Sequence, residues 1–400
     1  MIKFIKKYSN LLIIIFSFFM IFVLIHQIID TSIVGSSVYN SYELQAKAWL
    51  KGQVFLDRNY EYLELAIYNG HYFVSFPPFP SIFLLPFVII FGDSIPTNLI
   101  SFIIFSSCFF ILYRLLKKLK YNEFISILLS LAFTIGTNLI SISMDSGVWF
   151  LAQLLNYLLC LLAVNSFLNK KKIYVFLFLA LAVGCRPFSL IYMIMFFIYS
   201  LVSDKENKLF VKLKINIMYL LPSIIIGLCY MFYNYIRFDN ILEFGHNYLP
   251  EFTAAVNGQF SINYLLPNLK ELFFNEIDVD SRLHLHFMMP FCFFIANPIL
   301  IVYIYEMIKK YIKKKKINFL NILVLIFVCI NIILICLHKT LGAWQFGARY
   351  TIDILPFVFL GLIYDNDVKE YRLNKLEIMI IIFGVILNVF GTILMYTVMK

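Results

Sequence analysis

Long apolar runs separated by short polar segments make up this chain from end to end. Runs of about 17–25 residues recur, and each is long enough to cross a hydrocarbon core about 30 Å thick. The runs are continuous rather than alternating, which favours α-helices over the strands of a β-barrel. The pattern predicts an all-α membrane protein that forms one domain over residues 1–400, with about eleven transmembrane helices.

Basic clusters at the ends of these runs set the expected orientation, because Lys and Arg concentrate in cytoplasmic loops. With the clusters inside, the N-terminus is cytoplasmic and the C-terminus is outside. The predicted spans are Asn10–Ile29, Thr97–Leu116, Glu123–Met144, Gly147–Asn169, Ile173–Gly184, Phe188–Ser203, Ile215–Ile236, His286–Ile308, Ile317–Leu337, Ile352–Tyr364 and Leu376–Met399.

Two long polar segments then fall on the extracytoplasmic side, over residues 30–96 and 237–285. In the first, Tyr42–Gly52 has apolar and aromatic residues on one face, which predicts an amphipathic helix on the outer leaflet. Ser81–Gly92 is apolar but too short to span, so we expect an interfacial or partly inserted helix. These segments are where binding or chemistry is expected.

Composition agrees with a membrane protein, since 62% of residues are hydrophobic, 14% are charged and mean hydropathy is +0.85. The net charge of +10 lies at helix ends, so it follows the topology and does not indicate nucleic-acid binding. The seven cysteines lie mostly within apolar runs without a CxxC pair, which is typical of small core residues.

Ionisable residues are concentrated at the expected extracytoplasmic ends of the helices. Placing such residues near membrane depth costs free energy, so their presence there suggests a function. They are Asp30, Asp145, Arg186, Arg237, Glu243, His246, His284, His286, His338, Lys339, Arg349 and Asp353. Asp30 closes the first helix and is a candidate general base, with Glu43 and Asp57 as the other candidates and Glu61 and Glu64 further on. The alternative is that these acids are ordinary solvated charges.

Arg186 and Arg349 are candidate ligands for a phosphate or carboxylate, because a guanidinium group forms paired hydrogen bonds with such anions. Arg186 is equally compatible with a snorkelling arginine. Arg349 and Asp353 are four residues apart, so a helix that starts early places them on one face, where they either contact ligand or pair with each other.

Among the remaining outer residues, Tyr68 and Tyr72 are candidates for stacking on sugar rings. Arg237, Glu243 and His246 complete the candidate substrate-binding set. His284 and His286 are two apart without a carboxylate at a motif-like spacing, so no metal site or other cofactor is indicated, although a divalent metal stays compatible. No nucleotide-binding motif is present.

Four segments, YNGHYFVSFPPFPSIFLLPF, GCRPFSL, FYNYIRFDNILEFGHNYLP and QFGARYTIDILPF, resemble in this order a bacterial family of polytopic membrane glycosyltransferases. These enzymes have the GT-C fold and are distantly similar to protein O-mannosyltransferases and the lipid A aminoarabinose transferase. The resemblance covers nearly the whole chain.

The resemblance implies an inverting transferase that takes a sugar from a polyprenyl-phosphate carrier on the outer face of the cell membrane. An acid of the first outer loop would deprotonate the hydroxyl of a glycan, lipid or protein acceptor, and basic residues would hold the leaving phosphate. Relatives carry an Asp-Glu pair about fourteen residues before a glycine like Gly52, where this chain has Val38, Tyr39 and Asn40. The alternatives are a transporter or flippase of lipid-linked sugars and a non-catalytic subunit of an envelope assembly.

Overall fold

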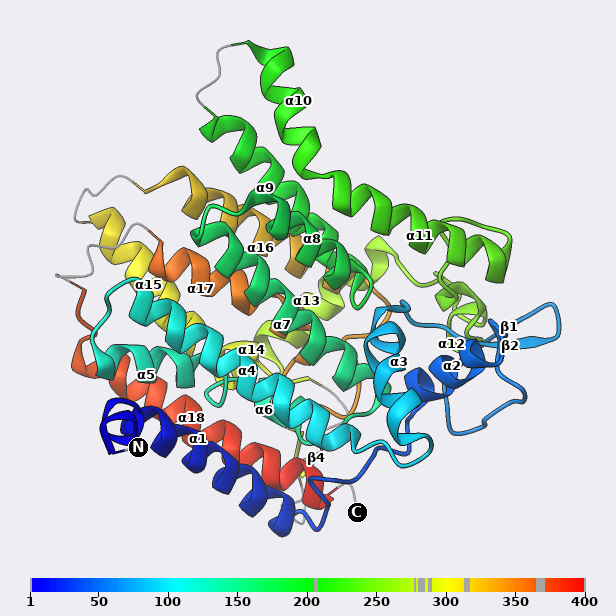
Figure 1. Cartoon of the computed structure of the whole chain (residues 1–400), viewed down its shortest axis with the longest axis horizontal. Helices are drawn as coiled ribbons and strands as arrows, with labels where there is room; N and C mark the ends of the chain where they lie inside the picture. Colours follow the sequence, from blue (N-terminus) through cyan, green and yellow to red (C-terminus); the bar gives the residue numbers. More distant parts are fainter. Residues whose placement is uncertain are drawn as a thin grey trace.

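The computed structural model describes residues 2–204, 208–276, 278–279, 285–286, 290–312, 317–364 and 371–398. Most of these residues form α-helices, and the strands among them make two short antiparallel hairpins (Figure 1). The all-α class is therefore confirmed.

The elements follow in this order along the chain. The first half contains α1 (Ile2–Ile28), α2 (Ser41–Leu50), β1 (Leu65–Tyr68), β2 (His71–Val74), α3 (Phe79–Phe91), α4 (Thr97–Lys118), α5 (Glu123–Ala132), α6 (Leu139–Ser143), α7 (Val148–Leu168), α8 (Lys172–Val183), η1 (Pro187–Ser189) and α9 (Leu190–Ser203). The second half contains α10 (Leu209–Tyr219), α11 (Leu221–Phe238), η2 (His246–Tyr248), α12 (Pro250–Thr253), η3 (Ile262–Tyr264), α13 (Leu265–Phe274), β3 (Asp278–Val279), β4 (Leu285–His286), α14 (Phe293–Ala296), α15 (Ile299–Ile312), α16 (Phe319–Leu337), η4 (Arg349–Ile354), α17 (Leu355–Ile363) and α18 (Lys375–Val398).

Four of the described helices, α4, α7, α16 and α18, are long and apolar enough to cross a membrane, and the pair α10–α11 makes a fifth if it is one bent span. Shorter apolar helices of 10–17 residues accompany them. The chain therefore carries the helices of a membrane protein. The prediction of about eleven spans is not confirmed at these lengths.

Three predicted spans are interrupted rather than continuous. The segment Glu123–Met144 forms α5 and α6 with turns between them, and there the backbone oxygen of Gly136 lies against Gly384 of α18. The segment Ile215–Ile236 bends by 55° between α10 and α11. Pro222 in the first turn of α11 explains the bend, because proline lacks an amide hydrogen and clashes with the preceding turn.

The predicted span His286–Ile308 is likewise divided into α14 and α15, and its start lies in β4 beside residues outside the described part of the chain. Proline again explains the break, because Pro298 precedes the first residue of α15 and cannot continue the hydrogen bonding of α14. Local prolines thus shorten helices that apolar composition alone would extend.

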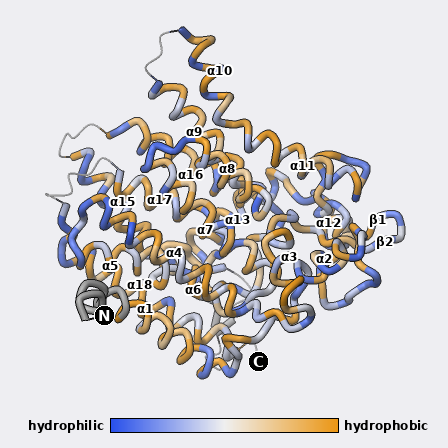
Figure 2. The backbone as a smooth tube through the Cα atoms, in the orientation of Figure 1, coloured by the Kyte–Doolittle hydropathy of each residue, from blue (hydrophilic) through white to orange (hydrophobic). Residues whose placement is uncertain are grey.

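Hydrophilic residues are concentrated at two ends of the helical bundle, with apolar helices between them (Figure 2). One end holds the N-terminus and the C-terminal ends of α4, α9, α15 and α17, and the other holds α2, the β1–β2 hairpin and α12 (Figure 1). This arrangement separates the lysines in the last turns of α4 and α15 from the polar segments in which a site was predicted.

The first outer segment contains a hairpin that the helix pattern did not predict. Leu65 pairs with Val74 and Tyr68 pairs with His71 across a turn in which Asn69 and Gly70 both have positive φ. An Asn-Gly pair favours this turn, because the twist of such turns matches that of the strands. The hairpin packs on the end of α11 through a small apolar core of Ala66, Phe73 and Phe238.

The two predicted helices of this segment are present as α2 and α3. The buried face of α2 is partly polar, because Gln45 accepts a hydrogen bond from Ser81 of α3 at 2.7 Å and donates to Tyr233 of α11 at 3.1 Å. Helix α2 is therefore packed into the protein by specific hydrogen bonds rather than by an apolar face alone.

Gly347 is a position where the fold requires glycine. Its φ is +76°, and a Cβ added there would lie 2.2 Å from the Cβ of Ala296 in α14. We expect Gly347→Ala to lower the free energy of unfolding by about 2–4 kcal/mol, from the left-handed backbone and the clash together. Gly227→Ala is the control, since Gly227 lies within α11 with nothing within 4 Å of an added Cβ.

Thermal unfolding of both variants in detergent measures this difference. Gly227→Ala should keep or slightly raise the unfolding temperature, because alanine favours a helix by about 0.5–1 kcal/mol over glycine. An unfolding temperature for Gly347→Ala equal to that of the wild type would contradict the close contact with Ala296.

Candidate functional site

A cavity of about 430 Å³ lies at the end of the bundle that carries α12 and the hairpin. Its wall combines the first outer segment, the start of α7, the segment from η2 to α13 and the connection between α16 and η4. The lining residues are Tyr39, Glu64, Phe76, Trp149, His246, Leu249, Glu251, Phe252, Asn268, Glu271, His338, Lys339, Thr340, Leu341, Gly342, Ala343, Trp344, Arg349 and Tyr350.

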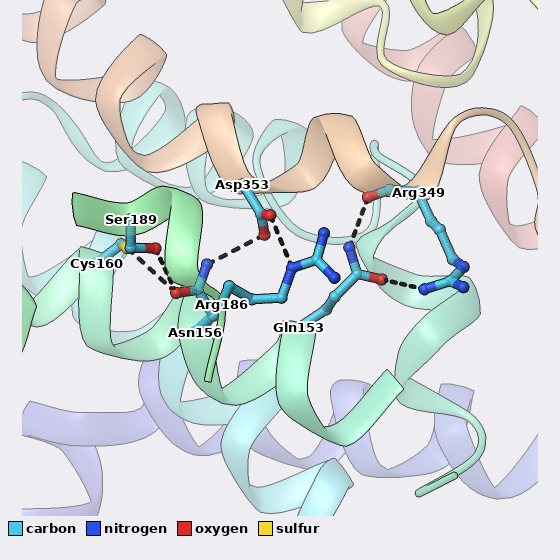
Figure 3. Close-up of polar contacts among 7 residues, drawn as sticks. All are labelled: Gln153, Asn156, Cys160, Arg186, Ser189, Arg349 and Asp353. Atoms are coloured by element: carbon cyan, nitrogen blue, oxygen red, sulfur yellow. Dashed lines mark hydrogen bonds and ion pairs between the residues drawn. The ribbon is translucent and has the colours of Figure 1, made fainter. Parts of the chain in front are cut away.

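Arg349 provides a buried positive charge in this wall, with only 4% of its surface exposed. Its Nη1 donates to Oε1 of Gln153 at 3.1 Å, and the amide of Gln153 donates back to the carbonyl of Arg349 at 3.0 Å (Figure 3). Its Nε has no hydrogen-bond partner among the described residues. A fixed guanidinium charge in a cavity wall attracts an anion.

Gly342 allows Arg349 to take this position. An added Cβ on Gly342 would lie 3.0 Å from Nε of Arg349, and φ of Gly342 is +89°. A glycine therefore lets the backbone cover the guanidinium group closely.

A second arginine, Arg186, contacts Tyr350 of the cavity wall and belongs to a buried polar network (Figure 3). Nε of Arg186 pairs with Oδ2 of Asp353 at 3.1 Å, and Oδ1 of Asp353 accepts from Asn156 at 3.1 Å. Ser189 in turn donates to Asn156 at 2.7 Å. The network fixes Arg186 through Nε, which leaves its terminal nitrogens outside the ion pair.

Tyr350 contacts both arginines. The Cζ atom of Arg186 is 4.5 Å from the centre of the Tyr350 ring, and that of Arg349 is 4.8 Å from it. Both distances are within the range of cation–π attraction, which offsets part of the repulsion between like charges. The ring therefore helps to hold two cations close together.

Glu64 is the carboxylate of the first outer segment that faces this cavity. Its Oε2 accepts a hydrogen bond from the indole of Trp149 at 3.0 Å, and the Trp149 ring contacts Tyr39 at 5.0 Å between centres. Glu64 is exposed at the cavity, and desolvation by the protein around it raises its pKa, while the hydrogen bond from Trp149 opposes this shift. A carboxylate with a raised pKa and a fixed orientation suits a general base.

Glu251 and Lys339 form a half-exposed ion pair at the rim of the cavity. Nζ of Lys339 is 3.7 Å from Oε1 of Glu251, and it donates a hydrogen bond to the backbone carbonyl of Glu251 at 2.9 Å. The repulsion between Glu251 and Glu64 contributes to the raised pKa of Glu64. The two acids therefore face a common space.

Two histidines in the wall are neutral at physiological pH. Burial lowers the pKa of His246 to about 3 and that of His338 to about 4. The ring of His246 bonds the carbonyl of Ser75 at 2.8 Å, and the ring of His338 bonds the carbonyl of Thr340 at 2.8 Å. Both rings therefore supply polar atoms without adding charge.

The three acids predicted as bases lie away from the described cavity wall. Asp30 is exposed at the end of α1, and Asp57 is exposed and accepts from Tyr60 at 2.9 Å. Glu43 is buried on α2, and burial raises its pKa to about 7. Whether any of them acts in catalysis stays a prediction.

Two predicted ligand residues, Arg237 and Glu243, have local partners instead. Arg237 donates to the carbonyl of Val74 at 2.9 Å and to Asn234 at 3.0 Å, which joins α11 to the hairpin. Glu243 accepts from the amide of Gly245 at 2.6 Å.

The two predicted stacking tyrosines belong to the hairpin. Tyr68 donates to Asp239 at 3.1 Å, and Tyr72 pairs with Ile67 in the strand register. Neither residue is in the described cavity wall. The structure thus brings His246 and Arg349 into one cavity, while Arg186 contacts Tyr350 of its wall and Asp353 pairs with Arg186.

Arg349 and Asp353 do not pair, although the sequence left that alternative open. They lie in η4, where a three-residue turn places residues four apart on different sides. Asp353 therefore turns to Arg186 and Asn156 while Arg349 turns to Gln153.

The sequence analysis did not predict two residues of the site, Gln153 and Asn156, although their spacing in the sequence indicates a polar site. Gln153 and Asn156 are polar amides three residues apart in the otherwise apolar α7, so they share a face of that helix. A buried amide requires a hydrogen-bond partner, and such a pair indicates a polar site.

No group of three or more His, Cys, Asp or Glu that could hold a metal ion occurs within the described residues. His284 lies outside the described residues, and only the backbone of His286 is described. The prediction about metals therefore stays a prediction.

Comparisons with known protein families, curated proteins and solved structures find no match to this chain. The chemistry of the site therefore rests on its own residues. Two arginines and a lysine can hold an anion, and Glu64 can accept a proton.

Proposed function

We propose that the chain is a membrane glycosyltransferase that moves a sugar from a polyprenyl-phosphate donor to an acceptor on the outer face of the membrane. The observation that carries this proposal is one cavity lined by both the buried Arg349 and the acid Glu64. Transfer from a lipid phosphate needs a cation for the leaving group and a base for the incoming hydroxyl.

The cationic side of the cavity suits the phosphate of the donor. Arg349 lines the cavity, and Arg186 contacts the same Tyr350 ring. Charge that develops on the phosphate oxygen as the sugar leaves is stabilised by donors that are already fixed in place. Asp353 and Gln153 hold those two arginines in position.

Glu64 is the proposed base. The acceptor oxygen forms a bond to C1 of the sugar while the bond from C1 to the phosphate oxygen breaks. The electron pair of that bond leaves with polyprenyl phosphate, and the acceptor proton passes to Glu64. Attack from the side opposite the phosphate inverts the anomeric centre, as the family resemblance also implies.

The proposed orientation places this cavity outside the cell. The helix ends of α4 and α15, which carry lysines in their last turns, lie at the other end of the bundle, and such basic clusters concentrate in the cytoplasm (Figure 1). The partners are then the lipid-linked donor, a glycan, lipid or protein acceptor, and the bilayer itself. We also propose that the helices have the GT-C architecture.

A transporter or flippase of lipid-linked sugars is the second candidate. The 55° bend between α10 and α11 favours it, since broken helices are common in transporters. A transporter would move the donor without cleaving it, as would a non-catalytic subunit. Release of polyprenyl phosphate therefore separates the proposed enzyme from both alternatives.

The test is sugar transfer from radiolabelled polyprenyl-phosphate glucose and mannose in membranes that contain the wild type, Arg349→Gln or Arg114→Gln. We expect the wild type to transfer and Arg349→Gln to lose about 10–100-fold in rate, since a hydrogen bond to a charged group contributes roughly 1.5–3 kcal/mol. Arg114→Gln is the control because Arg114 is exposed on α4 outside the cavity wall.

Two results would contradict the proposal. One is a wild type that leaves both donors intact at every acceptor tested. The other is equal loss of transfer in the two arginine variants at equal expression, which would show a general effect of removing positive charge.

A further inference from the structure

A second cavity of about 370 Å³ adjoins the first. The two cavities share three lining residues, Glu64, Leu249 and Glu251. A molecule in either cavity therefore contacts the same short wall, and the proposed base is part of that wall.

The hairpin builds the apolar side of the second cavity. Leu65 and Ile67 line it together with Leu63, in the alternating pattern of a strand. Ala66 lies on the opposite face of β1 and packs against Phe238 in the small apolar core. One face of the hairpin thus anchors it to α11 while the other face shapes a binding surface.

The two cavities differ in charge. The polar lining of the second consists of Asn59, Glu61, Glu64 and Glu251, and no Lys, Arg or His occurs among its described lining residues. The first cavity also contains three acids, Glu64, Glu251 and Glu271, but it adds the cations Arg349 and Lys339. An anion therefore finds positive partners only in the first cavity and is repelled from the second, whereas hydroxyl and amine groups find acceptors in the second.

We propose that the second cavity binds the acceptor of the transfer, and that it selects a polyol that is uncharged or carries an amine over one that carries a phosphate or carboxylate. This inference rests on the proposed function and names the acceptor class for the same site. The shared wall lets Glu64 take the proton of an acceptor hydroxyl from one cavity while the sugar C1 and the phosphate lie in the other.

The selectivity can be measured with purified full-length protein in nanodiscs and one radiolabelled donor, polyprenyl-phosphate glucose or mannose. The acceptors are p-nitrophenyl glucoside, glucosaminide and glucuronide, which have similar size and differ in charge. We expect kcat/KM for the glucoside and the glucosaminide to exceed that for the glucuronide by about tenfold or more, since like charges in a binding site cost several kcal/mol.

Two variants test the assignment to the second cavity. Glu61→Lys should raise kcat/KM for the glucuronide and lower it for the glucosaminide, while Glu276→Lys, at an exposed acid outside both cavity walls, should change neither. Ile67→Trp should fill the cavity and lower kcat/KM for all three acceptors. Val256→Trp is its control, because Val256 is 100% exposed and outside both cavity walls.

Slow hydrolysis of the donor without an acceptor tests the proposed transferase function separately from the assignment of the acceptor to the second cavity. Val256→Trp should release polyprenyl phosphate into water at the wild-type rate, since Val256 is outside both cavity walls. An active wild type that uses the three acceptors equally, or an Ile67→Trp variant with wild-type kcat/KM, would overturn the acceptor assignment alone. A wild type that neither transfers nor hydrolyses either donor would overturn the proposed function and this inference with it.

Discussion

Replacing Glu64 with glutamine is expected to lower the rate of sugar transfer by about 10²–10⁴-fold, the usual contribution of a positioned general base. Glutamine keeps an oxygen that can accept the hydrogen bond from Trp149, so the side chain should stay in place. It cannot take the proton of the acceptor hydroxyl. The loss should therefore appear in kcat, with the KM for the donor close to that of the wild type.

The pH dependence of transfer gives a second measurement on the same residue. A base acts only when it is ionised, and desolvation by the surrounding protein, together with repulsion from Glu251, raises the pKa of Glu64. The rate should therefore fall as the pH drops through that raised pKa, at a pH above the ordinary range of glutamate. In Glu64→Gln the residual rate should no longer follow this titration.

Asp30→Asn, Glu43→Gln and Asp57→Asn provide the comparison, since these acids were predicted from sequence as bases. None of them is in the described cavity wall. If one of these variants alone loses transfer while Glu64→Gln retains it, the base is that acid and the role given to Glu64 is wrong.

The helices of this protein were largely predictable because apolar runs of membrane length have one stable form, in which every backbone group is hydrogen-bonded. The breaks were harder to predict. Pro222 and Pro298 each end a helix inside a run that hydropathy alone extends. The Asn69-Gly70 turn is a local hairpin signal that the surrounding aromatic residues obscured.

The candidate site was predicted only in part, because sequence shows which residues are polar but not which of them meet. Arg186 and Arg349 were expected at the outer mouth, and both lie at the cavity or beside it. Their partners were not predicted, since Arg186 reaches an acid 167 residues away and Arg349 reaches an amide 196 residues away. Glu64 likewise differs from the other acids by its hydrogen bond from Trp149, a residue 85 positions away in the sequence.

Removing the carboxylate of Asp353 is expected to destabilise the protein strongly. Asp353 is 2% exposed and pairs with Arg186, whose side chain is 19% exposed. Asp353→Ala leaves that guanidinium group buried without its counter-charge and leaves Asn156 without an acceptor. Breaking a buried pair in this way costs roughly 3–5 kcal/mol. Thermal unfolding in detergent should show a large fall in the unfolding temperature.

A second ion pair provides the matched control. Lys47 and Asp93 are 2.8 Å apart, but the Asp93 side chain is 95% exposed, so Asp93→Ala should leave the unfolding temperature unchanged. The double variant Arg186→Met with Asp353→Leu removes both buried charges and should recover much of the stability that Asp353→Ala loses. It should not recover transfer, because Arg186 is proposed to hold the donor phosphate. If the double variant is as unstable as Asp353→Ala, the loss comes from packing around residue 353, and a stranded charge on Arg186 is not its cause.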